Sequence, residues 1–252
     1  MSIKLGDLVT YLDSYLGVRA MQDHSQNGLQ VEGADEIDSL ALAVDTNQGT
    51  IDGAVMAHAQ MLIVHHGLFW GKPLPIVGPH RRRVQALLAS GCSLYACHLP
   101  LDRHPEVGNN AQLAALLGLR RTGEFGEAFG VPIGIIGEAP AGMTLDALAA
   151  GLEQATGARP QVLPGGGATV RRVAILSGDG AREIPAAAAA GCDTYVTGEL
   201  SHSAYHDAAE YGINVVYGGH YATETVGVKA LGRHLTREFG LPAAFIDRPT
   251  GI

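Results

Sequence analysis

Three short patterns in the chain combine imidazole and carboxylate side chains at spacings that suit a metal ion. The apolar run MLIVHH closes on His65 and His66, and His220 precedes Glu224 by four positions. Imidazole and carboxylate together suit Zn, Mn, Fe or Ni, whereas Ca prefers a shell of oxygen atoms alone. The third pattern is His-x-x-x-Asp, formed by His98 and Asp102. We therefore interpret these residues as candidate ligands of divalent metal ions.

The number of candidate ligands favours two ions over one. A catalytic site with a single metal ion commonly has three protein ligands and an open position. Two ions roughly 3.5–4 Å apart share a larger set, in which one carboxylate bridges them. Such a pair lowers the pKa of a bound water and suits hydrolysis of an activated carbon or phosphorus centre. The predicted ligand set is His65, His66, Asp102, His220 and Glu224, with Glu224 as the bridging carboxylate.

Each candidate also has a structural interpretation. Adjacent histidines often form a hydrogen-bonded pair at the surface, Asp102 suits a turn, and Glu224 suits the first turns of a helix. The histidine pair gains weight because it ends an entirely apolar run and precedes Gly67. His98 precedes Asp102 by four positions, and its role stays open between metal ligand, a donor that orients a metal-bound carboxylate, and proton shuttle.

Short apolar runs alternate with helical segments, and this order predicts an α/β fold. Strands are expected at Ser39–Asp45, Met61–His66 and Ser93–His98, with helices at Ile51–Ala59 and Arg82–Ser90. Short buried strands separated by helices are typical of a mostly parallel sheet that is covered on both faces. Functional residues gather at the carboxyl ends of such strands, where three of the candidate histidines are expected.

The second half of the sequence resembles the first. Leu40–Gly71 aligns with Val173–Ala204 without a gap, and both halves later end in a histidine followed four positions on by an acid. We therefore predict two similar lobes, residues 1–122 and 123–252, with the boundary near Gly123. Each lobe would have a mixed or mostly parallel sheet flanked by helices. The metal ions would lie in a cleft between them.

Composition excludes several classes of protein. The 252 residues carry 17 Lys and Arg against 25 Asp and Glu, a formal net charge of −8. This balance argues against binding to nucleic acid, since the one basic run, Arg81–Arg83, is short. No stretch of about 18 uncharged apolar residues predicts a membrane span, and the N-terminus does not resemble a signal peptide. Three cysteines with no paired spacing fit a reducing compartment, so we expect a cytoplasmic protein.

Several runs are similar to those of the family called GTP cyclohydrolase 1 type 2 homologs, in its short bacterial form. The similarity extends almost from end to end and keeps the order of the motifs. The runs are NGLQVEG (Asn27–Gly33), IVHHGLFW (Ile63–Trp70), HLPLD with HPEVGNNAQLAALLG (His98–Gly118), TGE (Thr197–Glu199) and GGHYATE (Gly218–Glu224).

The resemblance implies a fold, a site and an activity. It implies a dinuclear metal centre whose ligand positions match all five predicted residues in type. It also implies two α/β lobes and a ring-shaped homohexamer with its metal sites facing an internal cavity. The activity that the family name asserts is hydrolytic ring opening of GTP, in which His98 could move a proton. The chain is then a metal-dependent hydrolase of a small molecule; the alternative is a metal-binding scaffold or adaptor, possibly one that contacts nucleic acid through the ring.

Overall fold

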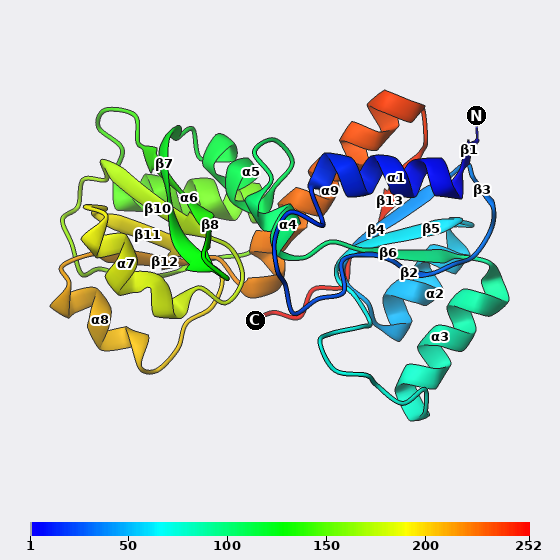
Figure 1. Cartoon of the computed structure of the whole chain (residues 1–252). Helices are drawn as coiled ribbons and strands as arrows, with labels where there is room; N and C mark the ends of the chain where they lie inside the picture. The colour runs from blue at the N-terminus through cyan, green and yellow to red at the C-terminus, as the bar shows by residue number, and fades with distance from the viewer. Residues whose placement is uncertain (1) are drawn as a thin grey trace. The chain divides into compact units, whose positions relative to one another are not determined.

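A computed structural model describes residues 2–252. The chain forms two compact units (Figure 1). Unit 1 comprises Met1–Leu101 and Val228–Arg248, and unit 2 comprises Asp102–Gly227 and Pro249–Ile252. The chain therefore enters unit 2 at Asp102, returns to unit 1 at Val228 within a long helix, and has its last four residues in unit 2.

Unit 1 is built on a five-stranded sheet in the order β13-β4-β5-β6-β2. Strands β13, β4, β5 and β6 are parallel, and β2 is antiparallel to β6. A separate two-stranded ribbon pairs β1 with β3. The elements are β1 (Ile3–Lys4), α1 (Leu5–Leu16), β2 (Gly28–Val31), β3 (Glu36–Ile37), β4 (Leu40–Asp45), α2 (Gln48–Met56), β5 (Met61–His66), α3 (Gly78–Ser90), β6 (Ser93–Ala96), the start of α4 (Leu99–Arg103), the second half of α9 (His220–Phe239) and β13 (Ala243–Phe245).

Helices cover both faces of this sheet, as a parallel sheet requires. One face packs against Ile51 of α2 and Leu87 of α3, and both side chains are fully buried. The opposite face carries α1 and α9 (Figure 1). Tyr95 of β6 points to that face and donates a hydrogen bond to Asp13 of α1 at 2.9 Å. The buried runs LALAV and MLIV form the centre of the sheet because they are apolar on both sides.

Unit 2 has a six-stranded sheet in the order β7-β8-β10-β11-β12-β9. Its central strands β10, β11 and β12 are parallel, and the strands at both edges are antiparallel to their neighbours. Helices α5 and α6 pack on one face of the sheet, and α7 and α8 pack on the other. The elements are α5 (Asn109–Leu116), β7 (Arg120–Ala128), β8 (Val131–Glu138), α6 (Leu145–Thr156), β9 (Gln161–Leu163), β10 (Arg172–Leu176), η1 (Ala181–Glu183), α7 (Ile184–Ala189), β11 (Thr194–Thr197), α8 (Ala204–Glu210) and β12 (Asn214–Tyr217).

The two units share the core topology that the sequence alignment predicted. In unit 1 Leu40 pairs with Met61, and in unit 2 Val173 pairs with Thr194, so both strand pairs have the same spacing along the chain. In unit 1 the strands β4, β5 and β6 are parallel neighbours, and the antiparallel strand β2 lies beside β6. In unit 2 the strands β10, β11 and β12 are parallel neighbours in the same way, and the antiparallel strand β9 lies beside β12. The predicted α/β class with sheets flanked by helices is therefore confirmed.

The bounds of the units differ from the predicted 1–122 and 123–252. Gly123 lies inside β7, which pairs along its length with β8, so the chain does not change unit there. The change falls at Leu101–Asp102 instead. The C-terminal segment also differs, because β13 pairs with β4 and returns Val228–Arg248 to unit 1. Within residues 2–252, no helix has the length and apolar character that a membrane span needs.

Candidate metal centre

In unit 1, the structure brings His65, His66 and His98 together at the carboxyl ends of β5 and β6. His65 and His66 are the last two residues of β5, and His98 follows β6. Each offers a ring nitrogen, and these nitrogens all lie within 4.8 Å of one another. The ring centroids of His65 and His66 are 4.6 Å apart, and those of His65 and His98 are 5.0 Å apart. Three imidazoles at this separation can hold a metal ion.

The three imidazoles share one orientation, because Nδ1 of each ring contacts a main-chain or carboxylate oxygen. Nδ1 of His65 lies 3.0 Å from the carbonyl of Cys97, and Nδ1 of His66 lies 2.7 Å from Asp45 Oδ1. Nδ1 of His98 lies 2.9 Å from Asp23 Oδ1. We assign the ring proton to Nδ1, which leaves the Nε2 lone pair for a metal. Ligating histidines commonly donate their other N–H to a carboxylate or carbonyl in this way.

The turn-rich stretch before β2 fixes the position of His98. Asp23 accepts hydrogen bonds from the main-chain amides of Ser25 and Leu99 and from the Asn27 side chain. Asn27 in turn accepts a hydrogen bond from the amide of His98 at 2.8 Å. Burial alone would raise the pKa of Asp23, but these bonds and the nearby His98 outweigh it and hold the pKa at about 2. The carboxylate is therefore ionised and can orient the His98 ring.

In unit 2, His220 and Glu224 lie one turn apart at the start of α9. His220 Nε2 lies 3.2 Å from Glu224 Oε1, while its Nδ1 contacts the carboxylate of Glu199. Burial on its own would lower the pKa of His220, but Glu224 and Glu199 outweigh it and raise the pKa to about 9. A divalent cation would compete with that proton, because a metal binds only the neutral ring. The His220 ring thus repeats the orientation of the three histidines in unit 1.

Asp102 is also brought to Glu224, within unit 2. Their carboxylate oxygens lie within 4.8 Å of each other, and both side chains are buried. Asp102 lies in the short helix α4 and not in a turn, which was its structural interpretation. Its Oδ1 accepts hydrogen bonds from Asn109 at 2.8 Å and from the Ser177 hydroxyl at 3.1 Å. Two buried carboxylates this close repel each other, and a cation relieves that repulsion.

The loop after β10, which contains Ser177 and Gly178, packs against Asp102 and Glu224. Gly178 adopts φ of +66°, and a Cβ there would overlap Glu224 Oε1 and lie 3.3 Å from His220 Nε2. Asn110 accepts a hydrogen bond from the amide of Ser177, and Thr223 accepts one from the amide of Gly178. The close approach of main chain to Glu224 therefore depends on glycine at this position.

Sequence reasoning did not assign the carboxylates that orient the histidines, namely Asp23, Asp45 and Glu199. Two of these had a visible signal: Asp45 ends the first apolar strand, and Glu199 follows β11 at the position that aligns with His66. Asp23 lies 75 positions before His98 in a stretch without periodicity. Nothing in the local sequence connects those two residues.

The chain is thus an α/β protein in which each unit carries histidines or carboxylates that could hold a metal ion beside its parallel strands. The profile of the Duf34/NIF3 (NGG1p interacting factor 3) family matches residues 3–250, and the chain belongs to this family. A Deinococcus radiodurans protein called GTP cyclohydrolase 1 type 2 homolog is 46% identical over 98% of this chain and 94% of its own length. A Pyrococcus horikoshii protein with the same name is 44% identical, over 98% of each chain.

Solved structures agree with this assignment. A protein called ybgI, described as of unknown function, superimposes with a TM-score of 0.92 at 39% identity, covering 99% of this chain and 100% of its own. A protein from Thermus thermophilus superimposes with a TM-score of 0.91 at 46% identity, with the same coverage. The fold described above is therefore the fold of these relatives.

Proposed function

We propose that the chain binds two divalent metal ions through His65, His66, Asp102, His220 and Glu224, and uses them to hydrolyse a small molecule. The observation that carries this proposal is the common orientation of the histidines. In all four candidate rings, Nδ1 contacts a carboxylate or carbonyl oxygen. Surface histidines have no reason to share this arrangement, whereas metal ligands do.

The donor set fits a first-row divalent ion. Imidazole nitrogen with carboxylate oxygen suits Zn, Mn, Fe or Ni, and the buried carboxylates of Asp102 and Glu224 offset half of the charge of two dications. When bound, such ions lower the pKa of a coordinated water and polarise a substrate carbonyl or phosphoryl group. The protein contributes fixed ring orientations, through Asp23, Asp45 and Glu199, and a rigid loop at Gly178.

We assign His98 to proton transfer, with its ring beside the metal ligands. Asp23 holds the Nδ1 proton of His98, so Nε2 is the atom that can take up or release a proton. The ring centroid of His98 lies 5.0 Å from that of Trp70, which packs edge-on against it. The imidazole is thereby held on two sides while Nε2 faces the neighbouring histidines.

The names of the relatives favour GTP as the substrate to test first. The two named relatives both carry the label GTP cyclohydrolase 1 type 2 homolog. The reaction would add water to the imidazole ring of the base and open it. Cyclic amides and phosphoesters present similar activated centres and complete the substrate panel.

Loss of activity in selected variants tests this function. We expect His220→Ala to lower kcat at least 100-fold on the substrate that the panel identifies, with the metal content also reduced. We expect His98→Gln to lower kcat about 10²-fold, the range typical of a lost acid–base group, with metal content unchanged. The exposed His202→Ala is the matched control. Equal turnover by wild type and His220→Ala when both are supplied with metal, or wild-type turnover that survives removal of the metal by chelation, would contradict the proposal.

We further propose a homohexamer in the cytoplasm. The three cysteines are buried thiols, which suits a reducing compartment. Sedimentation equilibrium is expected to give a mass about six times the 26.2 kDa of the chain, because the resemblance to the family implies a ring of six identical subunits. A mass equal to one chain across the micromolar range would exclude the hexamer without affecting the metal proposal.

A further inference from the structure

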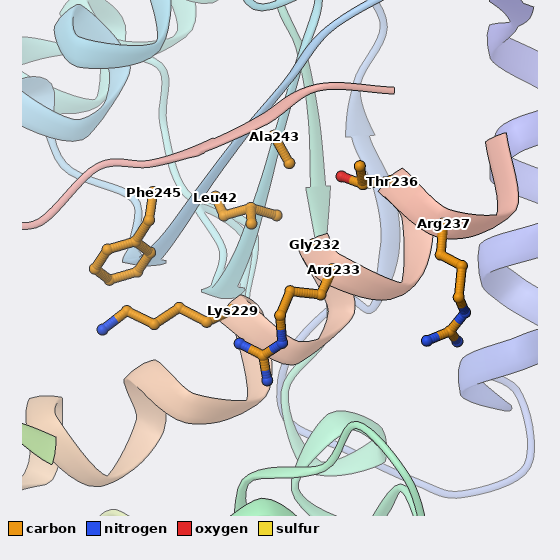
Figure 2. Close-up of a pocket in the computed structure, with 8 residues that line it drawn as sticks. All are labelled: Leu42, Lys229, Gly232, Arg233, Thr236, Arg237, Ala243 and Phe245. Atoms are coloured by element: carbon orange, nitrogen blue, oxygen red, sulfur yellow. The ribbon is translucent and has the colours of Figure 1, made fainter. Parts of the chain in front are cut away.

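A groove runs between α9 and β13 in unit 1, and none of the candidate metal ligands lines it. Its volume is about 440 Å³, within the range of pockets that bind ligands. Figure 2 shows Leu42, Ala243 and Phe245 around its apolar floor. Helix α9 supplies the opposite wall. Gly232 lies at the middle of that wall, so the helix main chain approaches Leu42 closely.

Three cations line the α9 side of the groove, namely Lys229, Arg233 and Arg237 (Figure 2). They are spaced four residues apart, so they share one face of the helix and are separated by about 6 Å of rise. The whole chain carries a net charge of −8. A row of three cations beside an apolar floor therefore differs from the chain as a whole and suits an anionic occupant.

Lys229 is the cation that contacts the apolar floor of the groove. Its Nζ lies 4.3 Å from the centroid of the Phe245 ring. Burial lowers the pKa of Lys229, while Asp247 partly opposes that shift. An ammonium group that has lost part of its hydration gains more from a nearby anion than one in bulk water does. Arg237 contacts His234 and Glu238, and 69% of its side chain is exposed.

The groove is bounded by an open sheet edge. Among the described strands, β13 pairs only with β4. The carbonyl of Pro242 and the amide of Ile246 both bond toward β4, each at 2.8 Å. Alternate residues of a strand direct their main-chain groups to opposite sides. The amides and carbonyls of Ala243 and Phe245 therefore face away from β4, where another strand could pair with them.

We propose that this groove binds an extended acidic segment of a partner protein, which adds to the sheet beside β13. Side chains on one face of an extended strand repeat about every 6.8 Å, close to the 6 Å between the cations. Acidic side chains four positions apart would then meet the two ends of the row, and an apolar side chain midway between them would contact Leu42 and Phe245. Strand addition of this kind gives affinity through the main chain and specificity through alternate side chains.

The charges disfavour a second copy of β13 as the occupant. Pairing β13 with its own copy would bring Lys229, Arg233 and Arg237 of each chain toward the same row of the other. Like charges at such distances repel. An acidic partner has the opposite sign and removes the conflict.

Fluorescence anisotropy with short labelled peptides tests the proposal. The probe is a blocked pentapeptide with the order glutamate, threonine, valine, threonine, glutamate, and the comparison peptide has lysine in place of both glutamates. We expect the acidic peptide to bind at least about 10-fold more tightly at low salt, with affinity falling as salt rises. Two further acidic peptides show which main-chain amides pair with β13. One is methylated at the amides of both threonines, and the other at the amide of the valine alone. Only one of these peptides should lose binding, because alternate residues face β13.

Variants of the full chain locate the site. Lys229→Glu and Arg237→Glu are each expected to weaken the acidic peptide at least about 10-fold and to improve binding of the lysine peptide. Lys229→Met repeats the test without adding a negative charge, and the exposed Arg82→Glu is the control that should change nothing. Equal affinity for both peptides, or equal loss with both methylated peptides, would overturn the proposal. So would a change in assembly mass in Lys229→Glu, which would show that another copy covers the groove.

Discussion

Glu224→Gln is expected to reduce the metal content from two ions per chain to almost none. Glu224 is buried, lies 3.2 Å from His220 Nε2 and lies close to the carboxylate of Asp102. In the proposed centre it bridges both ions, so its loss weakens both at once. An amide keeps the shape of the side chain but removes the charge that balances the dications. Elemental analysis of protein purified without chelators measures the outcome.

Two further variants make this result specific. The exposed Glu153→Gln removes the same charge from α6 and should leave the metal content unchanged. His66→Ala removes a ligand of one ion and should leave about one ion per chain. If Glu224→Gln retains both ions, the bridging role is wrong. If His66→Ala loses none, that histidine is not a ligand.

Gly178→Ala is expected to weaken metal binding by 10- to 100-fold, the range seen when residues that support metal ligands are changed. The added methyl group would overlap Glu224 Oε1 and lie 3.3 Å from His220 Nε2. Glu224 would have to move, because the loop main chain is held by Thr223. Isothermal titration with Mn or Zn into metal-free protein gives the change in affinity.

A second glycine controls for backbone strain in that experiment. Gly142 also has a positive φ, of +83°, but a Cβ there meets nothing within 4 Å. Alanine at either position costs about 1–2 kcal/mol for the left-handed conformation. Gly142→Ala should therefore lower thermal stability by a similar amount and leave metal affinity unchanged. Equal metal affinities in the two variants would mean that Gly178 does not support Glu224.

The sequence was sufficient for the strands that end in candidate ligands. MLIVHH is apolar up to its last two residues, and the structure places both at the end of β5. The helix that ends at Ser90 and the strand that begins at Ser93 were also predicted, because their patterns are local. The repeated order of strands in the two halves followed from the alignment, and the identical register of the first strand pairs explains why that alignment has no gap.

The bounds of the units could not be predicted, because long-range pairing decides them. The last strand, β13, has only three residues, and its sequence AAF does not reveal that it pairs with Leu40–Leu42. Helix α9 is continuous from His220 to Phe239, yet its first residues belong to unit 2 and those after Gly227 to unit 1. Periodicity predicts a helix but not which sheet each of its turns contacts.

The orientations of the histidine rings could not be predicted from the sequence either, because they also depend on long-range contacts. Whether Nδ1 or Nε2 of a histidine is available depends on its hydrogen-bond partner. Three of those partners, Asp23, Asp45 and Glu199, lie 21 or more positions away from the rings they contact. The candidate ligands were thus found from strand ends and spacing, whereas the hydrogen bonds that orient their rings became visible only in the fold.

Anomalous diffraction from crystals grown with Mn or Zn tests the central claim most directly. The proposal predicts two peaks roughly 3.5–4 Å apart, each about 2.0–2.2 Å from the Nε2 atom of a histidine among His65, His66 and His220. Glu224 should lie within bonding distance of both peaks. A single peak far from Glu224, or none near these histidines in protein shown to be folded, would contradict the dinuclear centre.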